Sequence, residues 1–136
     1  MSTRNYHSDC HRKYILQAHV ILSCKYRKKL LIKLGDIVKQ IIMNVADTHG
    51  FKICTMEVDK DHLHILIDYS PSWALKDLIS LIKQMTTYHI WHSYDYEKFL
   101  KNHFWKEKTL WTDGYFVCSV GDANEQTIRH YIESQG

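Results

Sequence analysis

The sequence is poor in the features that mark disordered, disulfide-bonded, secreted and membrane proteins. Its 136 residues include one proline and five glycines, and 45% are hydrophobic, which is typical of a globular chain. The four cysteines form no C-x-x-C pair, so we expect neither a zinc knuckle nor a disulfide framework. No apolar run is long enough to cross a membrane, and the basic segment 1–13 lacks the apolar core of a signal peptide. We therefore expect one domain, residues 1–136, located in the cytoplasm.

Acidic residues are scarce in the first part of the chain. Residues 1–40 contain nine Lys or Arg against two Asp, whereas the remainder contains nine Lys or Arg against thirteen Asp or Glu. The densest positive cluster is Lys25-Tyr26-Arg27-Lys28-Lys29. A cationic cluster that contains an aromatic residue suits phosphates and unstacked bases, and the alternative is a solvated basic loop. Charge alone does not identify the polyanion that binds.

Two histidines stand two positions apart in a segment with the periodicity of a strand. Leu63, Ile65 and Ile67 point to one side, and His62 and His64 point to the other. Two residues of strand separate the imidazoles by about 6.6–7 Å along the backbone, close enough for both to bind one divalent ion. An isolated His-x-His pattern more often belongs to an ordinary surface strand. The metal-binding interpretation therefore depends on a second element near the C-terminus.

That second element is a predicted helix over residues 124–135. Asn124 or Asp122 can cap its start, and two isoleucines at i, i+4 supply an apolar contact. Tyr131 and Gln135 are also four residues apart, so they lie one above the other on a neighbouring stripe. A tyrosine beside an amide, facing a His-x-His strand, suggests phosphoryl transfer with a tyrosine nucleophile. The alternative is an ordinary half-buried tyrosine followed by a solvated glutamine.

The periodicities along the chain predict the order β-α-β-β-α-β, followed by the C-terminal helix. Strands are expected at 14–24, 51–59, 62–69 and 115–120, and helices at about 34–50 and 73–91. Segments 1–13 and 92–113 lack clean periodicity and are expected to be an irregular arm and a long connection. This order is typical of the ferredoxin-like (RRM-like) α+β fold, in which both helices cover one face of an antiparallel sheet. The histidine pair would lie on the open face of a central strand, and His19 is expected to have a polar partner without an assigned role.

Four motifs along the chain resemble those of the single-tyrosine HUH transposases of small single-strand insertion sequences, whose close cousins are the REP-associated tyrosine transposases. The motifs are Lys25-Tyr26-Arg27, Asp61-His62-Leu63-His64-Ile65-Leu66, Leu110-Trp111-Thr112-Asp113-Gly114-Tyr115-Phe116 and Tyr131-Ile132-Glu133-Ser134-Gln135. The resemblance extends from about Tyr14 to Gln135. The chain departs from the family on the second predicted helix, where Lys83-Gln84-Met85-Thr86-Thr87-Tyr88 replaces a Lys-Gly-x-Ser-Ser-Arg-like run.

The resemblance implies a metal-dependent DNA strand transferase. His62, His64 and Gln135 would hold Mg²⁺ or Mn²⁺, and Tyr131 would attack the scissile phosphate to give a 5′-phosphotyrosine and a free 3′-OH. Relatives act as homodimers in which each tyrosine helix lies against the partner's His strand.

The substrate that the resemblance implies is single-stranded DNA with short hairpins at the ends of the element. Lys25, Arg27, Lys28 and Lys29 are the candidates for backbone contacts, and Tyr26 is the candidate for base stacking. Three other interpretations stay open. They are a domesticated relative that acts on repeated palindromic DNA, a non-catalytic ferredoxin-like binder of single-stranded nucleic acid, and a metal-dependent hydrolase that uses water as the nucleophile.

Overall fold

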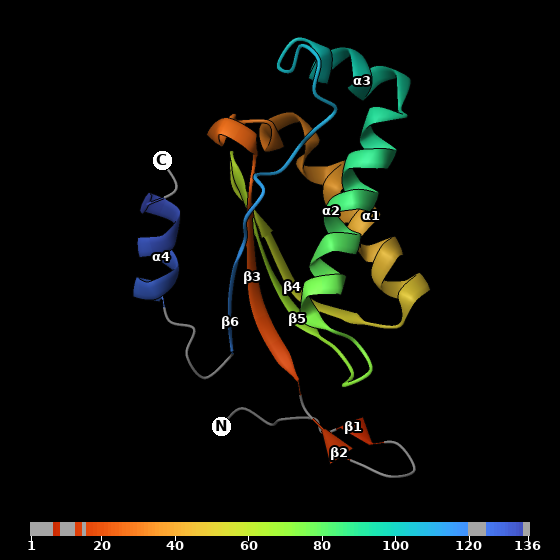
Figure 1. Cartoon of the computed structure of the whole chain (residues 1–136), viewed down its shortest axis with the longest axis vertical. Helices are drawn as coiled ribbons and strands as arrows, with labels where there is room; N and C mark the ends of the chain where they lie inside the picture. Colours follow the sequence, from red (N-terminus) through yellow and green to blue (C-terminus); the bar gives the residue numbers. More distant parts are fainter. Residues whose placement is uncertain (1–6, 9–12, 15, 120–124, 135–136) are drawn as a thin grey trace.

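An antiparallel four-stranded sheet lies at the centre of the computed structural model, which describes residues 7–8, 13–14, 16–119 and 125–134 (Figure 1). The strands are β3 (Gln17–Ser23), β4 (Lys52–Val58), β5 (His62–Asp68) and β6 (Phe116–Ser119). They lie in the order β4-β5-β3-β6, so β5, which carries the histidine pair, is central. The predicted succession β-α-β-β-α-β is confirmed, with additional elements before the first strand and after the second helix.

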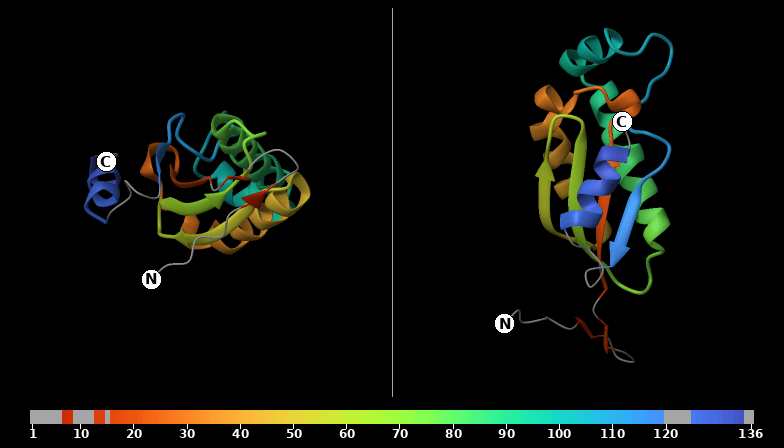
Figure 2. Two further views of the ribbon diagram at one scale, coloured as in Figure 1. Left: turned by 90° about the horizontal axis from the view of Figure 1, so that it is seen from below. Right: turned by 90° about the vertical axis from the view of Figure 1, so that its left-hand side faces the viewer.

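Two long helices, α1 (Leu31–His49) and α2 (Leu75–Trp91), cover one face of this sheet (Figure 2). Their buried residues recur at helical spacing because each helix presents one apolar stripe to the sheet. Gly50 has a φ of 77° and ends α1, since glycine enters the left-handed region without a steric penalty.

The strand alternation of β5 places its apolar side chains in the core. Leu63, Ile65 and Ile67 are fully buried beneath the helices, whereas His62 and His64 are half-buried. Because successive strand residues point to opposite faces, both imidazoles lie on the face that α1 and α2 leave uncovered. The prediction that the histidine pair occupies the open face is confirmed.

The prediction of an irregular connection over 92–113 is wrong in part, because α3 (Tyr94–Lys101) lies within it. Tyr96, Phe99 and Leu100 pack against the core at i, i+3 and i+4, but the helix has only eight residues, so its apolar period covers about one turn and does not stand out in the sequence. The expectation of an irregular arm over 1–13 is also wrong in part. The two-residue strands β1 (His7–Ser8) and β2 (Lys13–Tyr14) pair there, and they are too short to show alternation.

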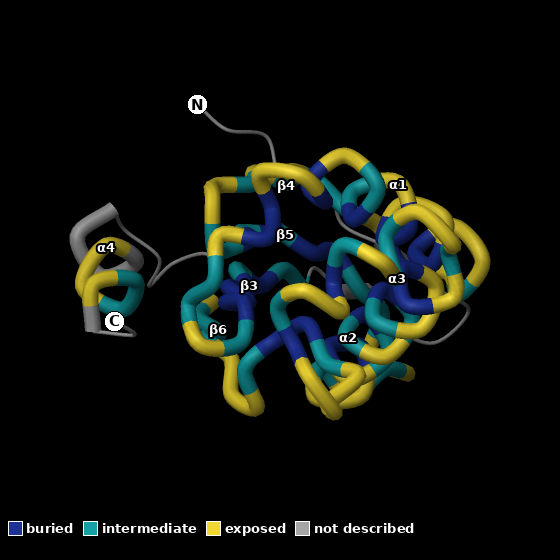
Figure 3. The backbone as a smooth tube through the Cα atoms, turned by 90° about the horizontal axis from the view of Figure 1, so that it is seen from above, coloured by how far each residue is buried: buried dark blue, intermediate teal, exposed yellow. Residues whose placement is uncertain are grey.

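The C-terminal helix α4 (Glu125–Ser134) stands on the open face of the sheet, opposite α1 and α2 (Figures 2 and 3). Ile21 of β3 points to this face, in register with His64 and Phe116, and it is fully buried. The centre of the open face, beside His64, is therefore shielded from solvent. No helix in the described part of the chain has the length and apolar character needed to cross a membrane.

Candidate active site

The imidazole of His62 is oriented by the carboxylate that precedes it. His62 Nδ1 lies 3.0 Å from Asp61 Oδ1, so Nδ1–H donates to the carboxylate and Nε2 keeps its lone pair. A carboxylate in this position fixes the tautomer of many metal-binding histidines. Burial alone would raise the pKa of Asp61, but hydrogen bonds from His62 and Arg27 outweigh it, and the pKa is lowered. Asp61 is therefore an anion at neutral pH.

The imidazole of His64 contacts His19 on the neighbouring strand β3. His19 Nδ1 and His64 Nε2 are 2.7 Å apart, and the ring centroids are 4.9 Å apart. Burial lowers the pKa of both rings, so both are neutral at pH 7 and one nitrogen donates a hydrogen bond to the other. The polar partner expected for His19 is thus His64.

A hollow of about 270 Å³ opens beside the histidine pair. Its walls come from β4, the β4–β5 turn, β5 and α4, namely Glu57, Val58, Asp59, His62, His64 and Ile132. Glu57 faces His64 directly across the β4–β5 ladder, and its charge opposes the lowering of the His64 pKa. Helix α4 therefore forms one wall of a polar hollow that its own chain's histidines line.

Tyr131 precedes the residue of α4 that lines this hollow. Its ring is half-buried and stacks on Phe116 of β6, with centroids 4.7 Å apart and ring planes 29° apart. Burial raises the pKa of Tyr131, and the charge of Arg27 acts in the opposite direction. The phenol is therefore protonated at neutral pH and needs electrostatic assistance to act as a nucleophile. Gln135, like the predicted cap residues Asp122 and Asn124, lies outside the described residues.

The fit of a divalent ion here depends on which imidazole nitrogens keep a lone pair. His62 offers Nε2 because its Nδ1–H is engaged by Asp61. His64 offers Nδ1 when its Nε2–H is the donor toward His19. Within the described residues, no group of three or more His, Cys, Asp and Glu side chains is placed to hold a metal ion. The imidazole pair fits an ion that takes further ligands from elsewhere, such as the oxygens of a phosphate.

The basic cluster after β3 folds into a tight turn, the 3₁₀ segment η1 (Lys25–Arg27). Tyr26 and Arg27 have φ values of 60° and 53°, in the left-handed region that L-residues rarely adopt. Such a conformation costs about 1–3 kcal/mol per residue and persists where surrounding contacts over-determine it. The turn is therefore held in place by its neighbours.

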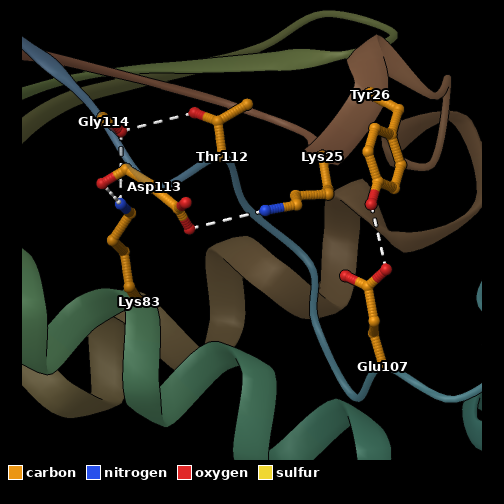
Figure 4. A network of polar contacts seen from close by, with 7 residues as sticks. All are labelled: Lys25, Tyr26, Lys83, Glu107, Thr112, Asp113 and Gly114. Atoms are coloured by element: carbon orange, nitrogen blue, oxygen red, sulfur yellow. Dashed lines mark hydrogen bonds and ion pairs between the residues drawn. The ribbon is translucent and has the colours of Figure 1, made fainter.

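Those neighbours engage several of the residues predicted to contact DNA (Figure 4). Lys25 Nζ lies 3.4 Å from Asp113 Oδ1, and Tyr26 Oη donates to Glu107 Oε1 at 2.9 Å, while Tyr26 as a residue is 62% exposed. Arg27 turns inward and donates from Nε to Asp61 Oδ2 at 3.0 Å. Among the described residues, the side chains of two lysines of the cluster, Lys28 and Lys29, form no hydrogen bond or ion pair. The DNA-binding role of the cluster stays a prediction.

The comparison with known protein families identifies the chain. A family model described as "Transposase IS200 like" matches residues 12–135. This chain belongs to the IS200-like transposase family.

Two curated transposases are similar over most of their length. The chain is 32% identical over 123 residues to the ISDra2 transposase TnpA of Deinococcus radiodurans, covering 90% of this chain and 85% of that protein. It is 22% identical over 129 residues to the transposase for insertion sequence element IS200 of Salmonella typhimurium, covering 94% of this chain and 82% of that protein.

Two solved structures share the fold. A transposase candidate from Deinococcus radiodurans superimposes with a TM-score of 0.84 at 26% identity, covering 95% of this chain and 97% of that one. The REP-associated tyrosine transposase bound to a REP hairpin superimposes with a TM-score of 0.56 at 15% identity, covering 92% of this chain and 68% of that one. The second likeness concerns the fold alone.

In this IS200-like transposase, the altered motif on α2 packs against the motif that precedes β6. Lys83 Nζ donates to the carbonyl oxygens of Asp113 and Gly114 at 3.0 and 3.2 Å (Figure 4). Thr86 is fully buried, and its Oγ1 accepts a hydrogen bond from Trp111 Nε1 at 2.8 Å. These two residues of the altered motif therefore hold the segment before β6 in place.

Sequence reasoning missed two residues of the candidate site, His19 and Glu57. The signal for Glu57 was present, because counting back from the short β4–β5 turn places it opposite His64. His19 lies 45 residues from His64, and no local pattern gives the register of β3 against β5. Its imidazole could be placed beside His64 only once the sheet was known.

Proposed function

We propose that this transposase cleaves and rejoins single-stranded DNA at hairpin-marked ends, with Tyr131 as the nucleophile. One observation carries the proposal. Ile132, the neighbour of Tyr131 on α4, lines the same hollow as His62 and His64. A phenol-bearing helix that meets two imidazoles on the open face of a sheet is suited to phosphoryl transfer, and the family membership narrows the substrate to DNA.

A divalent ion, Mg²⁺ or Mn²⁺, is part of the proposal, held by His62 and His64 and by Gln135. Once bound, such an ion would polarise the scissile phosphate and offset the negative charge that develops on attack. Asp61 keeps the His62 Nε2 lone pair directed away from itself, and His19 restricts the ring of His64. Because two imidazoles bind hard ions moderately, the phosphate would contribute to ion binding.

The proposed step conserves the energy of the phosphodiester. Tyr131 Oη attacks phosphorus, the P–O3′ bond breaks, the phenol proton passes to solvent, and the departing 3′-oxygen takes up a proton. The products are a 5′-phosphotyrosine and a 3′-hydroxyl. A second 3′-hydroxyl can attack the same phosphorus, release Tyr131 and reseal the strand without ATP.

Substrate binding is assigned to the basic turn. Lys28 and Lys29 would contact phosphates, and the exposed ring of Tyr26 would stack on an unpaired base. One nucleophilic tyrosine per chain supports a homodimer, because excision of an element requires two cleavages. The homodimer is tested by measuring the molar mass in solution by light scattering, with and without hairpin DNA.

The decisive experiment for the chemistry is adduct formation on a single-stranded hairpin oligonucleotide with Mn²⁺, resolved on a denaturing gel. We expect wild-type protein to form a covalent adduct and Tyr131→Phe to bind the DNA without forming one. Tyr94→Phe is the matched control, because Tyr94 is 87% exposed on α3, away from the site. A normal adduct yield from Tyr131→Phe would remove Tyr131 from the mechanism. The absence of any adduct with wild-type protein, in Mn²⁺ or Mg²⁺, would favour a non-catalytic DNA binder.

The role of the histidines is tested separately. His64→Ala should lose cleavage and the response to added metal together, whereas His103→Ala, just after α3 and in contact with Phe99, should retain both. Cleavage by His64→Ala that still requires Mn²⁺ would mean that the ion is held elsewhere.

A further inference from the structure

We infer that Arg27 is a positioning residue that ties the orientation of His62 to the placement of helix α4. The structural part of this inference rests on the contacts of Arg27. Its consequence for catalysis rests on the proposed function. It differs from the role that the sequence suggested for Arg27, which was contact with the DNA backbone.

A single carboxylate joins Arg27 to the histidine. Asp61 accepts one hydrogen bond at each carboxylate oxygen. Oδ1 accepts from His62 Nδ1 at 3.0 Å, and Oδ2 accepts from Arg27 Nε at 3.0 Å. A carboxylate held at both oxygens cannot rotate without breaking one of the two hydrogen bonds. The guanidinium therefore restricts the group that fixes the tautomer and direction of the His62 ring.

The same guanidinium also reaches α4. Arg27 Nη1 donates to the backbone carbonyl oxygen of Ile132 at 2.7 Å. Ile132 belongs to the last turn described for α4, where carbonyl oxygens lack an intrahelical partner and a cation is favourable. Arg27 thus caps the C-terminal turn of the helix that carries Tyr131, one residue away from the phenol.

Arginine is suited to both contacts at once. Its planar guanidinium presents five N–H donors in a fixed fork, whereas a lysine ammonium is a single centre on a flexible stem. The side chains of Arg27 and Asp61 are 21% and 19% exposed, so the network is shielded from solvent. The neighbouring Lys28 shares the charge and the loop, but its Nζ lies over the ring of Phe104 and not toward α4.

The backbone of the turn holds Arg27 in this direction. Cys24 N donates to Asp61 O at 2.8 Å, and Arg27 N donates to Cys24 O at 2.9 Å. These two hydrogen bonds join the turn to the residue before β5. The left-handed φ of Arg27 is consistent with a side chain whose position is fixed by contacts on both sides. The strained turn, the carboxylate and the last turn of α4 therefore form one connected unit.

The test is hydrogen exchange of the α4 amides in the full chain without DNA or metal. Removal of a hydrogen bond from a charged donor should speed exchange in 125–134 by about 10-fold or more in Arg27→Ala. Arg27→Lys should resemble Arg27→Ala in α4, and Lys28→Ala should resemble wild type. In a double-mutant cycle, the effects of Arg27→Lys and Asp61→Asn on α4 amide exchange should be non-additive, because the two residues act through one network.

A second measurement follows the His62 ring directly. Long-range ¹⁵N–¹H NMR spectra of the imidazoles should show His62 protonated at Nδ1 in wild type and a mixture of tautomers in Arg27→Ala. The inference would be overturned if Arg27→Ala left both α4 exchange and the His62 tautomer unchanged. If that variant also lost hairpin affinity as Lys28→Ala does, Arg27 would belong with the residues that contact DNA. Neither readout uses covalent adduct formation, so failure of the proposed chemistry and failure of this inference are distinguishable.

Discussion

His19 Nδ1 and His64 Nε2 lie 2.7 Å apart across β3 and β5. The two rings come from elements separated by 45 residues of sequence, and they share the open face with His62. Because both rings are neutral at pH 7, one nitrogen donates to the other, and His64 keeps a lone pair at Nδ1 when its Nε2–H is the donor toward His19. A partner of this kind determines how well a histidine presents its lone pair to an ion.

We therefore predict that His19→Ala weakens Mn²⁺ binding by about 10-fold or more, measured by calorimetry or by loss of the free Mn²⁺ electron paramagnetic resonance signal. His19→Asn should recover part of the affinity, because an asparagine side chain places a polar atom near the position of Nδ1. His49→Asn on α1 is a matched control outside the site. Equal Mn²⁺ affinity in wild type and His19→Ala would show that His64 does not depend on this partner.

Thr86 and Ser23 provide a contrast between a satisfied and an unsatisfied buried hydroxyl. Thr86 Oγ1 accepts from Trp111 Nε1 at 2.8 Å, whereas Ser23 Oγ is buried without a hydrogen-bond partner among the described residues. Thr86→Val keeps the side-chain volume but leaves the indole N–H unpaired, which should lower the free energy of unfolding by about 1–3 kcal/mol. Ser23→Ala should leave it unchanged or slightly raised. Urea unfolding of both variants checks this, and an equal loss in the two would contradict it.

The elements that could be predicted from the sequence are those whose own side chains repeat a pattern. Leu63, Ile65 and Ile67 alternate in β5, and this alternation alone placed His62 and His64 on the opposite face. The helix α1 has a continuous apolar stripe that ends at a glycine with positive φ. In each case the pattern of buried and exposed positions can be seen in residues that lie close together in the sequence.

The features that could not be predicted depend on contacts between residues that are distant in sequence, or on backbone conformations that the residue types do not indicate. The contact of His19 with His64 requires the register of β3 on β5. The inward direction of Arg27 requires positive φ at two successive residues that are not glycine. Helix α3 packs Tyr96, Phe99 and Leu100 against the core, but with eight residues it is too short for this period to be distinct in the sequence. Such features are determined by tertiary packing.

Tyr26 is predicted to contribute to hairpin binding through its ring and not through its hydroxyl. Tyr26 is 62% exposed, and its Oη donates a hydrogen bond to Glu107 Oε1 at 2.9 Å. Tyr26→Ala should weaken hairpin affinity by about 10-fold or more, the cost of one base–aromatic stack, whereas Tyr26→Phe should keep most of it. Fluorescence anisotropy with a labelled hairpin measures both.

Tyr94→Ala is the control for the loss of an exposed aromatic ring, because Tyr94 is 87% exposed on α3. Equal affinities for wild type and Tyr26→Ala would remove Tyr26 from the DNA-binding surface. The double variant Lys28→Ala/Lys29→Ala separately tests the phosphate contacts, and it should also reduce the dependence of affinity on salt.

The burial of Cys24 predicts that the folded protein loses stability at alkaline pH. Its side chain is fully buried, and burial raises the pKa of the thiol to about 12, with the nearby Asp61 charge adding to the effect. The unfolded chain releases the thiol proton near the ordinary value of 9.0, whereas the folded chain retains it. The contribution of Cys24 to stability is therefore complete below pH 9 and is lost as the pH rises toward 12, at up to about 1.4 kcal/mol per pH unit.

We accordingly expect the free energy of unfolding in urea to fall between pH 8 and pH 10.5 in wild type, and to fall less in Cys24→Ala. The comparison between the two proteins is needed because burial lowers the pKa of Lys83, which contributes with the opposite sign over the same range. Iodoacetamide should correspondingly modify Cys24 only after unfolding, since the thiolate is the reactive form and the folded state disfavours it. Parallel pH profiles for wild type and Cys24→Ala would mean that the buried thiol does not account for the alkaline loss of stability.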